Sequence, residues 1–110
     1  MPRFVPDPFR CELVSENGRA LVRLAGELDM STVPILEERL RQALAGGGRQ
    51  LVVDLRGLDF MDSTGLTLLV RWGLGAEQDG YELALVRGEE RVHRLFEITG
   101  LDSRFTFTTG

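Results

Sequence analysis

One stretch of the sequence, Leu51 to Leu66, constrains the fold more than any other. It begins with a short apolar run, Leu51 to Leu55, of the kind that forms a buried strand. After a polar turn, the cluster Asp62-Ser63-Thr64-Gly65 comes directly before a helical pattern. Small polar side chains are preferred there because the first backbone N–H groups of a helix have no partner within it. The stretch therefore predicts a strand, a turn and a helix that begins beside a small hydroxyl group.

The cluster at the start of this helix has two interpretations. On the simpler one, Asp62, Ser63 and Thr64 are only N-capping residues. On the other, Ser63 is a site of covalent modification, because a phosphate there would lie at the positive end of the helix dipole and beside the carboxylates of Asp62 and Asp59. The residues alone leave both open. The geometry suits a covalent switch better than a catalyst.

The segments around this stretch alternate between strands and helices. Asn17-Gly18 predicts a tight hairpin turn, because both central positions of a type I′ turn need a positive φ. Strands are expected at residues 9–13, 19–25, 51–55, 81–86 and 105–107, and helices from about 31 to 45, 64 to 78 and 89 to 99. This order, β-β-α-β-α-β-α-β, predicts an α/β fold whose sheet has four to five strands, mostly parallel, with an antiparallel hairpin at its start.

Two apolar side chains of the second helix do not fit a single buried face. Its expected core stripe consists of Leu66, Leu69, Val70 and Gly73. Leu68 and Trp72 fall on the opposite side of the helical wheel. They belong either to a second buried face or to an exposed docking surface beside Ser63. The second interpretation fits the enrichment of Trp in protein–protein interfaces.

Size and charge limit the classes of partner. With 110 residues the chain is long enough for one domain and one core. A net charge of −4 argues against direct binding of nucleic acid, which needs a basic surface.

Residues 1–8, rich in proline, are expected to form a loose arm, and residues 9–110 the domain. No stretch reads as a membrane span or a signal peptide, so a cytoplasmic protein without a membrane partner is expected.

Nucleophilic hydrolysis is the main enzymatic alternative. Ser63 would be the nucleophile and His93, the single histidine, its base. The Gly-x-Ser-x-Gly elbow is absent, because Met61 stands two positions before Ser63. His93 is expected on the exposed side of the third helix, with Arg91 and Arg94. The sequence therefore favours a protein that is not an enzyme.

Acidic and sulfur-containing side chains offer no clear cofactor or metal site. A carboxylate pair or a metal cluster could be drawn from Asp29, Asp54, Asp59 and Asp62, but no motif supports either. The one cysteine, Cys11, excludes an internal disulfide and a multi-cysteine metal site. Because it alternates with apolar neighbours, it is expected to be an unreactive core thiol. No cofactor and no metal are predicted.

Three segments resemble one bacterial family, the STAS-domain anti-sigma factor antagonists. Phe60 to Leu66 resembles the family's phosphorylation motif. Leu24 to Asp29 resembles the Gly-Glu-(Leu/Ile)-Asp signature at the end of its second strand. Val92 to Leu101 resembles its last helix and the turn that follows. The resemblance runs from about Phe9 to Phe107, in the same order and spacing. It implies a single STAS domain.

The resemblance implies a partner-switching cycle. The unmodified protein would bind an anti-sigma factor that is also a serine kinase, which frees the sigma factor. The kinase would phosphorylate Ser63 and weaken the complex, and a serine phosphatase would restore it. Other roles known for STAS domains remain open alternatives: a scaffold subunit of a stress-signalling assembly, or an accessory subunit of a lipid or anion transporter.

The resemblance also implies which residues a partner would contact. Asp29 and Asp62 would lie close to the phosphorylated serine. Asp29 is expected to end a strand in a loop, where it matters for recognition more than for folding. The complete partner-binding set expected is Asp29, Asp62, Ser63, Thr64, Gly65, Leu68 and Trp72.

Overall fold

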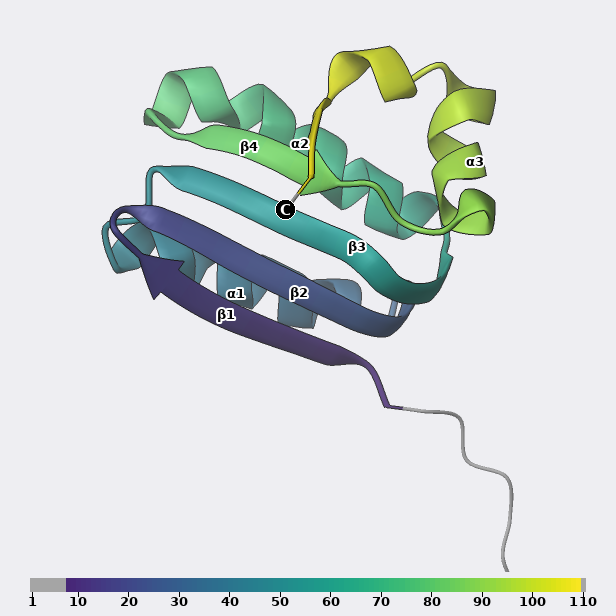
Figure 1. Cartoon of the computed structure of the whole chain (residues 1–110), viewed down its shortest axis with the longest axis horizontal. Helices are drawn as coiled ribbons and strands as arrows, with labels where there is room; N and C mark the ends of the chain where they lie inside the picture. The colour runs from purple at the N-terminus through teal and green to yellow at the C-terminus, as the bar shows by residue number, and fades with distance from the viewer. Residues whose placement is uncertain (1–7, 110) are drawn as a thin grey trace, which may run out of the picture.

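The computed structural model describes residues 8–109, so the arm expected at residues 1–8 falls almost wholly outside the described part of the chain. The elements are β1 (Arg10–Glu16), β2 (Arg19–Leu28), α1 (Val33–Ala45), β3 (Gln50–Met61), α2 (Ser63–Asp79), β4 (Glu82–Val86), α3 (Glu90–Thr99), the 3-10 turn η1 (Asp102–Arg104) and β5 (Thr106–Thr108) (Figure 1). The predicted order and the α/β class are confirmed.

The strands form one sheet in the order β1-β2-β3-β4-β5. β1 and β2 are antiparallel, and every later neighbour is parallel. The hairpin turn is the one the sequence predicts, with φ values of 53° at Asn17 and 78° at Gly18. Parallel neighbours bring the carboxyl ends of β2 and β3 to the same end of the sheet, where the helices α1 and α2 begin.

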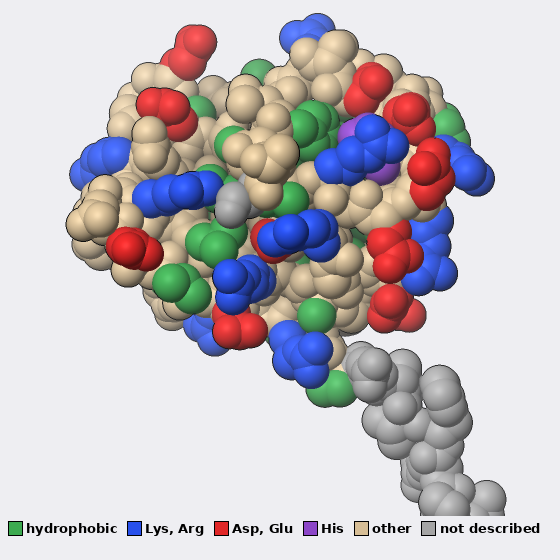
Figure 2. Space-filling view, in the orientation of Figure 1, with side chains coloured by type: hydrophobic (Ala, Val, Ile, Leu, Met, Phe, Trp, Pro, Cys, Tyr) green, Lys and Arg blue, Asp and Glu red, His purple; other side chains and the backbone are tan. Residues whose placement is uncertain are grey.

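Helices α1 and α2 lie behind the sheet in Figure 1, and α3 lies at one end of β3 and β4. The core between these layers is built from alternate residues of the strands, such as Val22, Leu24, Val53 and Leu55, all buried. In the part of the chain that the structure describes, the opposite face of the sheet carries no helix, and it mixes charged with apolar side chains (Figure 2). Within residues 8–109, no helix is both long and apolar enough to cross a bilayer.

Strand β3 is longer than predicted. A polar turn was expected after Leu55, but β3 continues to Met61. The pairing of β3 with β2 contains two register shifts. They interrupt the strict alternation of buried and exposed residues along β3, yet Leu58 and Met61 still lie on the buried side. A Cβ at Gly57 would collide with the carbonyl oxygen of Leu24. The irregular pattern that resembled a turn is therefore a bulged strand, and it delivers Asp62 directly to the start of α2.

Candidate functional site

The site predicted around Ser63 lies where β2 and β3 end side by side. Leu28 and Met61, the last residues of these strands, are paired in register. The backbone N–H of Asp62 donates to the carbonyl oxygen of Leu28 at 3.2 Å. Asp29 and Asp62 therefore leave neighbouring strands at the same end of the sheet. In open α/β sheets, ligands are commonly bound outside the carboxyl ends of the strands.

Asp62 is the residue that caps α2. Its backbone is extended, and its Oδ1 accepts hydrogen bonds from the N–H groups of Thr64 at 2.9 Å and Gly65 at 3.2 Å. Ser63 is thus the first residue of the helix, one position earlier than predicted. Its side chain is exposed, whereas its carbonyl oxygen accepts from the Thr67 hydroxyl at 2.8 Å. Asp62 therefore caps the helix, and the adjacent Ser63 provides an accessible hydroxyl.

Asp29 organises the start of α1. Its Oδ1 accepts from the Ser31 hydroxyl at 2.7 Å, the Ser31 N–H at 2.9 Å and the Thr32 N–H at 3.3 Å. The bond from the Ser31 hydroxyl is the main reason that the pKa of Asp29 lies below its usual value. Thr32 links the turn back to β2 by donating from its hydroxyl to the carbonyl oxygen of Glu27 at 2.8 Å. These bonds hold the loop, so Asp29 has a local structural role; that it matters for recognition more than for folding stays a prediction.

Gly65 has a structural role. A Cβ at this position would lie 2.9 Å from side-chain atoms of Leu28 and Met61. Gly65 is buried, and the absence of a side chain lets the first turn of α2 approach the ends of β2 and β3. Its expected place on the partner surface is therefore wrong, because a partner cannot reach it.

Leu68 and Trp72 form the second buried face of α2. Leu68 is 1% exposed and Trp72 9% exposed. The indole N–H of Trp72 donates to Glu37 of α1 at 3.2 Å, and its ring lies 5.8 Å from that of Tyr81. The helix packs against the sheet on one side and against α1 on the other. The docking interpretation, and with it the assignment of these two residues to the partner surface, is thus wrong.

His93 is buried, contrary to the expected exposed position. It is 5% exposed, stacks on Phe96 at a centroid distance of 5.7 Å, and makes an edge-to-face contact with Phe107 of β5 at 5.1 Å. The helical wheel of α3 could not show that β5 covers this side of the helix. Because His93 lies in this aromatic cluster under β5, it is not a base positioned at Ser63.

The remaining candidate groups do not assemble into a catalytic or metal site. Asp54 binds Arg56 through both carboxylate oxygens, at 3.0 and 2.8 Å, on the helix-free face, away from Asp29 and Asp62. Burial raises the pKa of the Cys11 thiol to about 11, so the thiol is not activated. Within residues 8–109, no group of three or more His, Cys, Asp or Glu side chains is arranged to hold a metal ion.

Exposed apolar side chains flank the site, and the sequence reasoning did not identify them. Met30, next to Asp29, is 76% exposed, and Phe60, three residues before Ser63, is 48% exposed. A shallow cleft between the end of β3 and α3 includes Phe60 in its lining. It is lined by Asp59, Phe60, Met61, Arg91, Arg94, Leu95 and Ile98. Apolar residues at the carboxyl ends of two strands, beside the predicted serine, were the signal that could have revealed this surface.

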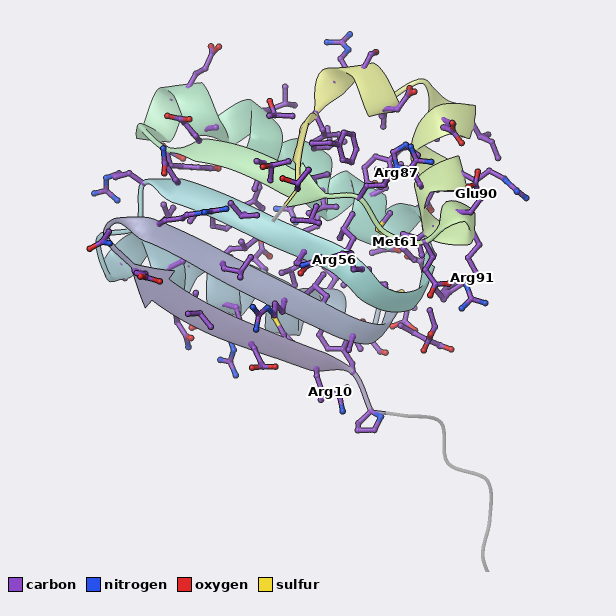
Figure 3. All side chains as sticks on the ribbon, in the orientation of Figure 1. Arg10, Arg56, Met61, Arg87, Glu90 and Arg91 are labelled. Atoms are coloured by element: carbon purple, nitrogen blue, oxygen red, sulfur yellow. The ribbon has the colours of Figure 1, made fainter. Side chains whose placement is uncertain are left out.

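Arg91 connects α3 to the end of β3. Its guanidinium lies 3.5 Å from a carboxylate oxygen of Asp59 and 3.4 Å from one of Glu89 (Figure 3). All three side chains are exposed, so these ion pairs contribute little to stability. They nevertheless neutralise part of the negative charge near the site.

Comparison with known proteins gives a consistent result. Residues 11–108 match the model of the family described as Mlab, STAS domain. Anti-sigma-B factor antagonists are similar in sequence: the Staphylococcus aureus protein is 45% identical over 80 residues, which are 73% of this chain and 74% of that protein. The protein of Staphylococcus epidermidis is 42% identical over 80 residues, with the same coverage.

Solved structures agree with the sequence relatives. A crystal structure of an anti-sigma factor antagonist from Mycobacterium paratuberculosis superposes with a TM-score of 0.83 at 27% identity, covering 96% of this chain and 90% of that one. The anti-sigma factor antagonist SpoIIAA in its unphosphorylated form gives a TM-score of 0.72 at 25% identity, covering 93% and 89%.

Proposed function

This chain belongs to the STAS-domain family and is an anti-sigma factor antagonist, and from that premise we propose that Ser63 is its phosphoacceptor. In this proposal the unmodified protein binds an anti-sigma factor that is also a serine kinase. ATP-dependent transfer of a phosphoryl group to the Ser63 hydroxyl weakens the complex, and a serine phosphatase hydrolyses the phosphate. The protein is the substrate of both enzymes.

The observation that carries the proposal is the division of roles between Asp62 and Ser63. A capping serine would have its hydroxyl engaged with the backbone, but here Asp62 provides the cap. The Ser63 side chain is exposed on the first turn of α2. A kinase can therefore reach the hydroxyl without opening the helix.

The same arrangement determines what a phosphate does. Asp62 already occupies the N–H groups of Thr64 and Gly65. A phosphate on Ser63 therefore adds roughly −1.5 to −2 charges beside an existing carboxylate, while the helix dipole offsets part of the repulsion. The fold is preserved, and the new charge projects outward. It acts on whatever surface a partner presents.

The charge of one phosphate is large enough to switch a complex. At ~6 Å and an effective dielectric of ~20, each pair of unit charges contributes about 2–3 kcal/mol. One repulsive pair across an interface therefore weakens binding roughly 30- to 150-fold. No refolding of the domain is required.

The partner surface in this proposal consists of the residues that surround Ser63 and are accessible. Asp29, Asp62 and Thr64 remain from the sequence-based set. Met30 and Phe60 are added because their exposed apolar side chains lie at the ends of the same two strands. Apolar anchors encircled by polar groups are typical of the centre of a protein interface.

Binding and phosphorylation of three variants test the proposal. Ser63→Ala should still bind the anti-sigma factor kinase. After incubation with this kinase and ATP, tandem mass spectrometry should detect no phosphate on the variant. Ser63→Asp should bind at least about tenfold more weakly, with an unchanged circular dichroism spectrum. The matched control is Ser103→Asp, because Ser103 also follows an aspartate, Asp102, and is exposed in η1. Phosphate that persists in Ser63→Ala, or a Ser103→Asp variant that binds as weakly as Ser63→Asp, would contradict it.

A further inference from the structure

Among residues 8–109, the outer edge of β1 presents backbone groups without a strand partner. In this described part of the chain, β1 lies at one end of the sheet and pairs only with β2. In a hairpin with a two-residue turn, the flanking pair Glu16–Arg19 exchanges backbone hydrogen bonds, and so does every second pair along the ladder. The N–H and C=O groups of Cys11, Leu13 and Ser15 therefore point away from β2. In agreement, the carbonyl oxygen of Cys11 accepts a bond from Arg39 Nε at 3.2 Å.

This edge lacks most of the features that normally prevent edge pairing. Proteins protect exposed edges with short strands, charged side chains, prolines, bulges or covering elements. β1 does carry charged side chains, at Arg10, Glu12 and Glu16. β5, at the other end of the sheet, is a strand of 3 residues. β1 has 7 residues, no proline and no register shift against β2. Arg39 engages one lone pair of one carbonyl, and a carbonyl oxygen can accept two hydrogen bonds.

The sequence of β1 is complementary to itself in one antiparallel register. If a two-fold axis passes through Leu13, the outward groups of Leu13 meet those of Leu13 in a second copy, and Cys11 meets Ser15. On the helix-free face, Arg10 then lies opposite Glu16 of the second copy, twice per dimer (Figure 3 shows the position of Arg10). Opposite charges in directly opposed positions stabilise a pair of strands.

Neighbouring registers are disfavoured by charge. Only slips of an even number of residues keep the hydrogen-bonding groups matched. A slip in one direction places Glu12 opposite Glu12 of the second copy, and a slip in the other places Glu12 opposite Glu16. Directly opposed like charges destabilise a strand pair. Within one copy, Glu12 and Glu16 are opposite Arg23 and Arg19, but Arg10 is opposite Ala25, so its complement is found across the proposed interface.

We propose that this protein forms a weak two-fold dimer by antiparallel pairing of β1 with β1 of a second copy. The pairing joins the two sheets into one continuous sheet. It leaves Ser63 accessible, because α2 follows β3 and β1 is on the far side of β2. A single edge strand buries little surface, so the dimer is expected to form in a concentration-dependent manner and not as a permanent complex.

Sedimentation equilibrium over a range of concentrations tests the dimer and its register. Arg10→Glu and Glu16→Arg each replace both Arg–Glu pairs by like-charged pairs, so each variant alone should dimerise at least about tenfold more weakly. An equimolar mixture of the two variants should recover the wild-type affinity, because only the mixed dimer has complementary charges at both positions. Glu82→Arg is the control, since it makes the same charge change on β4, three strands away.

Amide exchange provides a second readout. On raising the concentration of the wild type, the amides of Cys11, Leu13 and Ser15 should become protected, while those of β5 should not. Thermal melting of each variant confirms that it is folded, which matters for Glu16→Arg because it places an arginine opposite Arg19. A wild type that is monomeric up to ~1 mM, or a dimer unaffected by either charge change, would overturn the proposal.

Discussion

Asp62 and Leu28 are joined by a backbone hydrogen bond of 3.2 Å, from the N–H of Asp62 to the carbonyl oxygen of Leu28. This bond fixes the start of α2 at the end of β2. As a result, the helix that carries Ser63 begins beside the loop that carries Asp29, although the two residues are far apart in the sequence. The accessible surface around Ser63 therefore comes from two segments, the loop between β2 and α1 and the junction between β3 and α2.

The cap of α2 depends on the Asp62 side chain. Asp62→Ala leaves the N–H groups of Thr64 and Gly65 without their acceptor and should lower the free energy of unfolding by about 1 kcal/mol. Asp62→Asn keeps the acceptor oxygen and should lose much less. Urea denaturation of the two variants measures the difference. Equal losses would indicate that the charge matters for stability and the cap does not.

Asp29 combines a structural and a recognition role that two substitutions can separate. Asp29→Asn retains an oxygen for the bonds from Ser31 and Thr32, so it should melt near the wild type but bind the anti-sigma partner more weakly. Asp29→Ala should both melt at a lower temperature and bind more weakly. If Asp29→Asn binds normally, the carboxylate charge has no part in recognition. Calorimetry and a binding titration on the same samples provide both measurements.

Two glycines of α2 should respond oppositely to alanine. At Gly65 a methyl group meets Leu28 and Met61 at 2.9 Å, so Gly65→Ala should destabilise the protein by about 1–3 kcal/mol. At Gly73 the nearest atom, Cε1 of Phe105, lies 3.6 Å away, so Gly73→Ala should stabilise it by up to about 1 kcal/mol through helix propensity. Chemical denaturation of both variants tests the contrast. A stabilised Gly65→Ala would show that the close contact of α2 with the strand ends relaxes easily.

The ion pair on the helix-free face should make stability depend on pH. Hydrogen bonding to Arg56 holds the pKa of Asp54 below its usual value, so this carboxylate stabilises the folded state when it is ionised. Its contribution is fully present above the unfolded pKa, about 3.9, and is lost as the pH falls through the lower folded pKa. The difference in stability between the wild type and Asp54→Asn should therefore be constant above about pH 5 and shrink below about pH 4. A difference that is independent of pH would show that the ion pair is not the cause.

Local signals in the sequence determined the elements and their order. Asn17-Gly18 specifies its turn because few other residues accept positive φ at both positions. The helix that follows Asp62 was predictable to within one residue because capping uses atoms close in the chain. For the same reason Ser63 could be selected as the candidate phosphoacceptor from the motif around it.

Tertiary packing decided the positions that depend on distant segments. His93 is buried because β5, which follows α3 in the chain, returns over it, and Trp72 is buried because α1 lies against α2. The end of β3 is a strand because β2 offers a paired edge with shifted register. No pattern within one helix or strand contains this information. A side chain is buried only when another part of the chain packs against it. The sequence of one helix or strand therefore specifies which of its faces could be covered, and the tertiary structure decides which of them are.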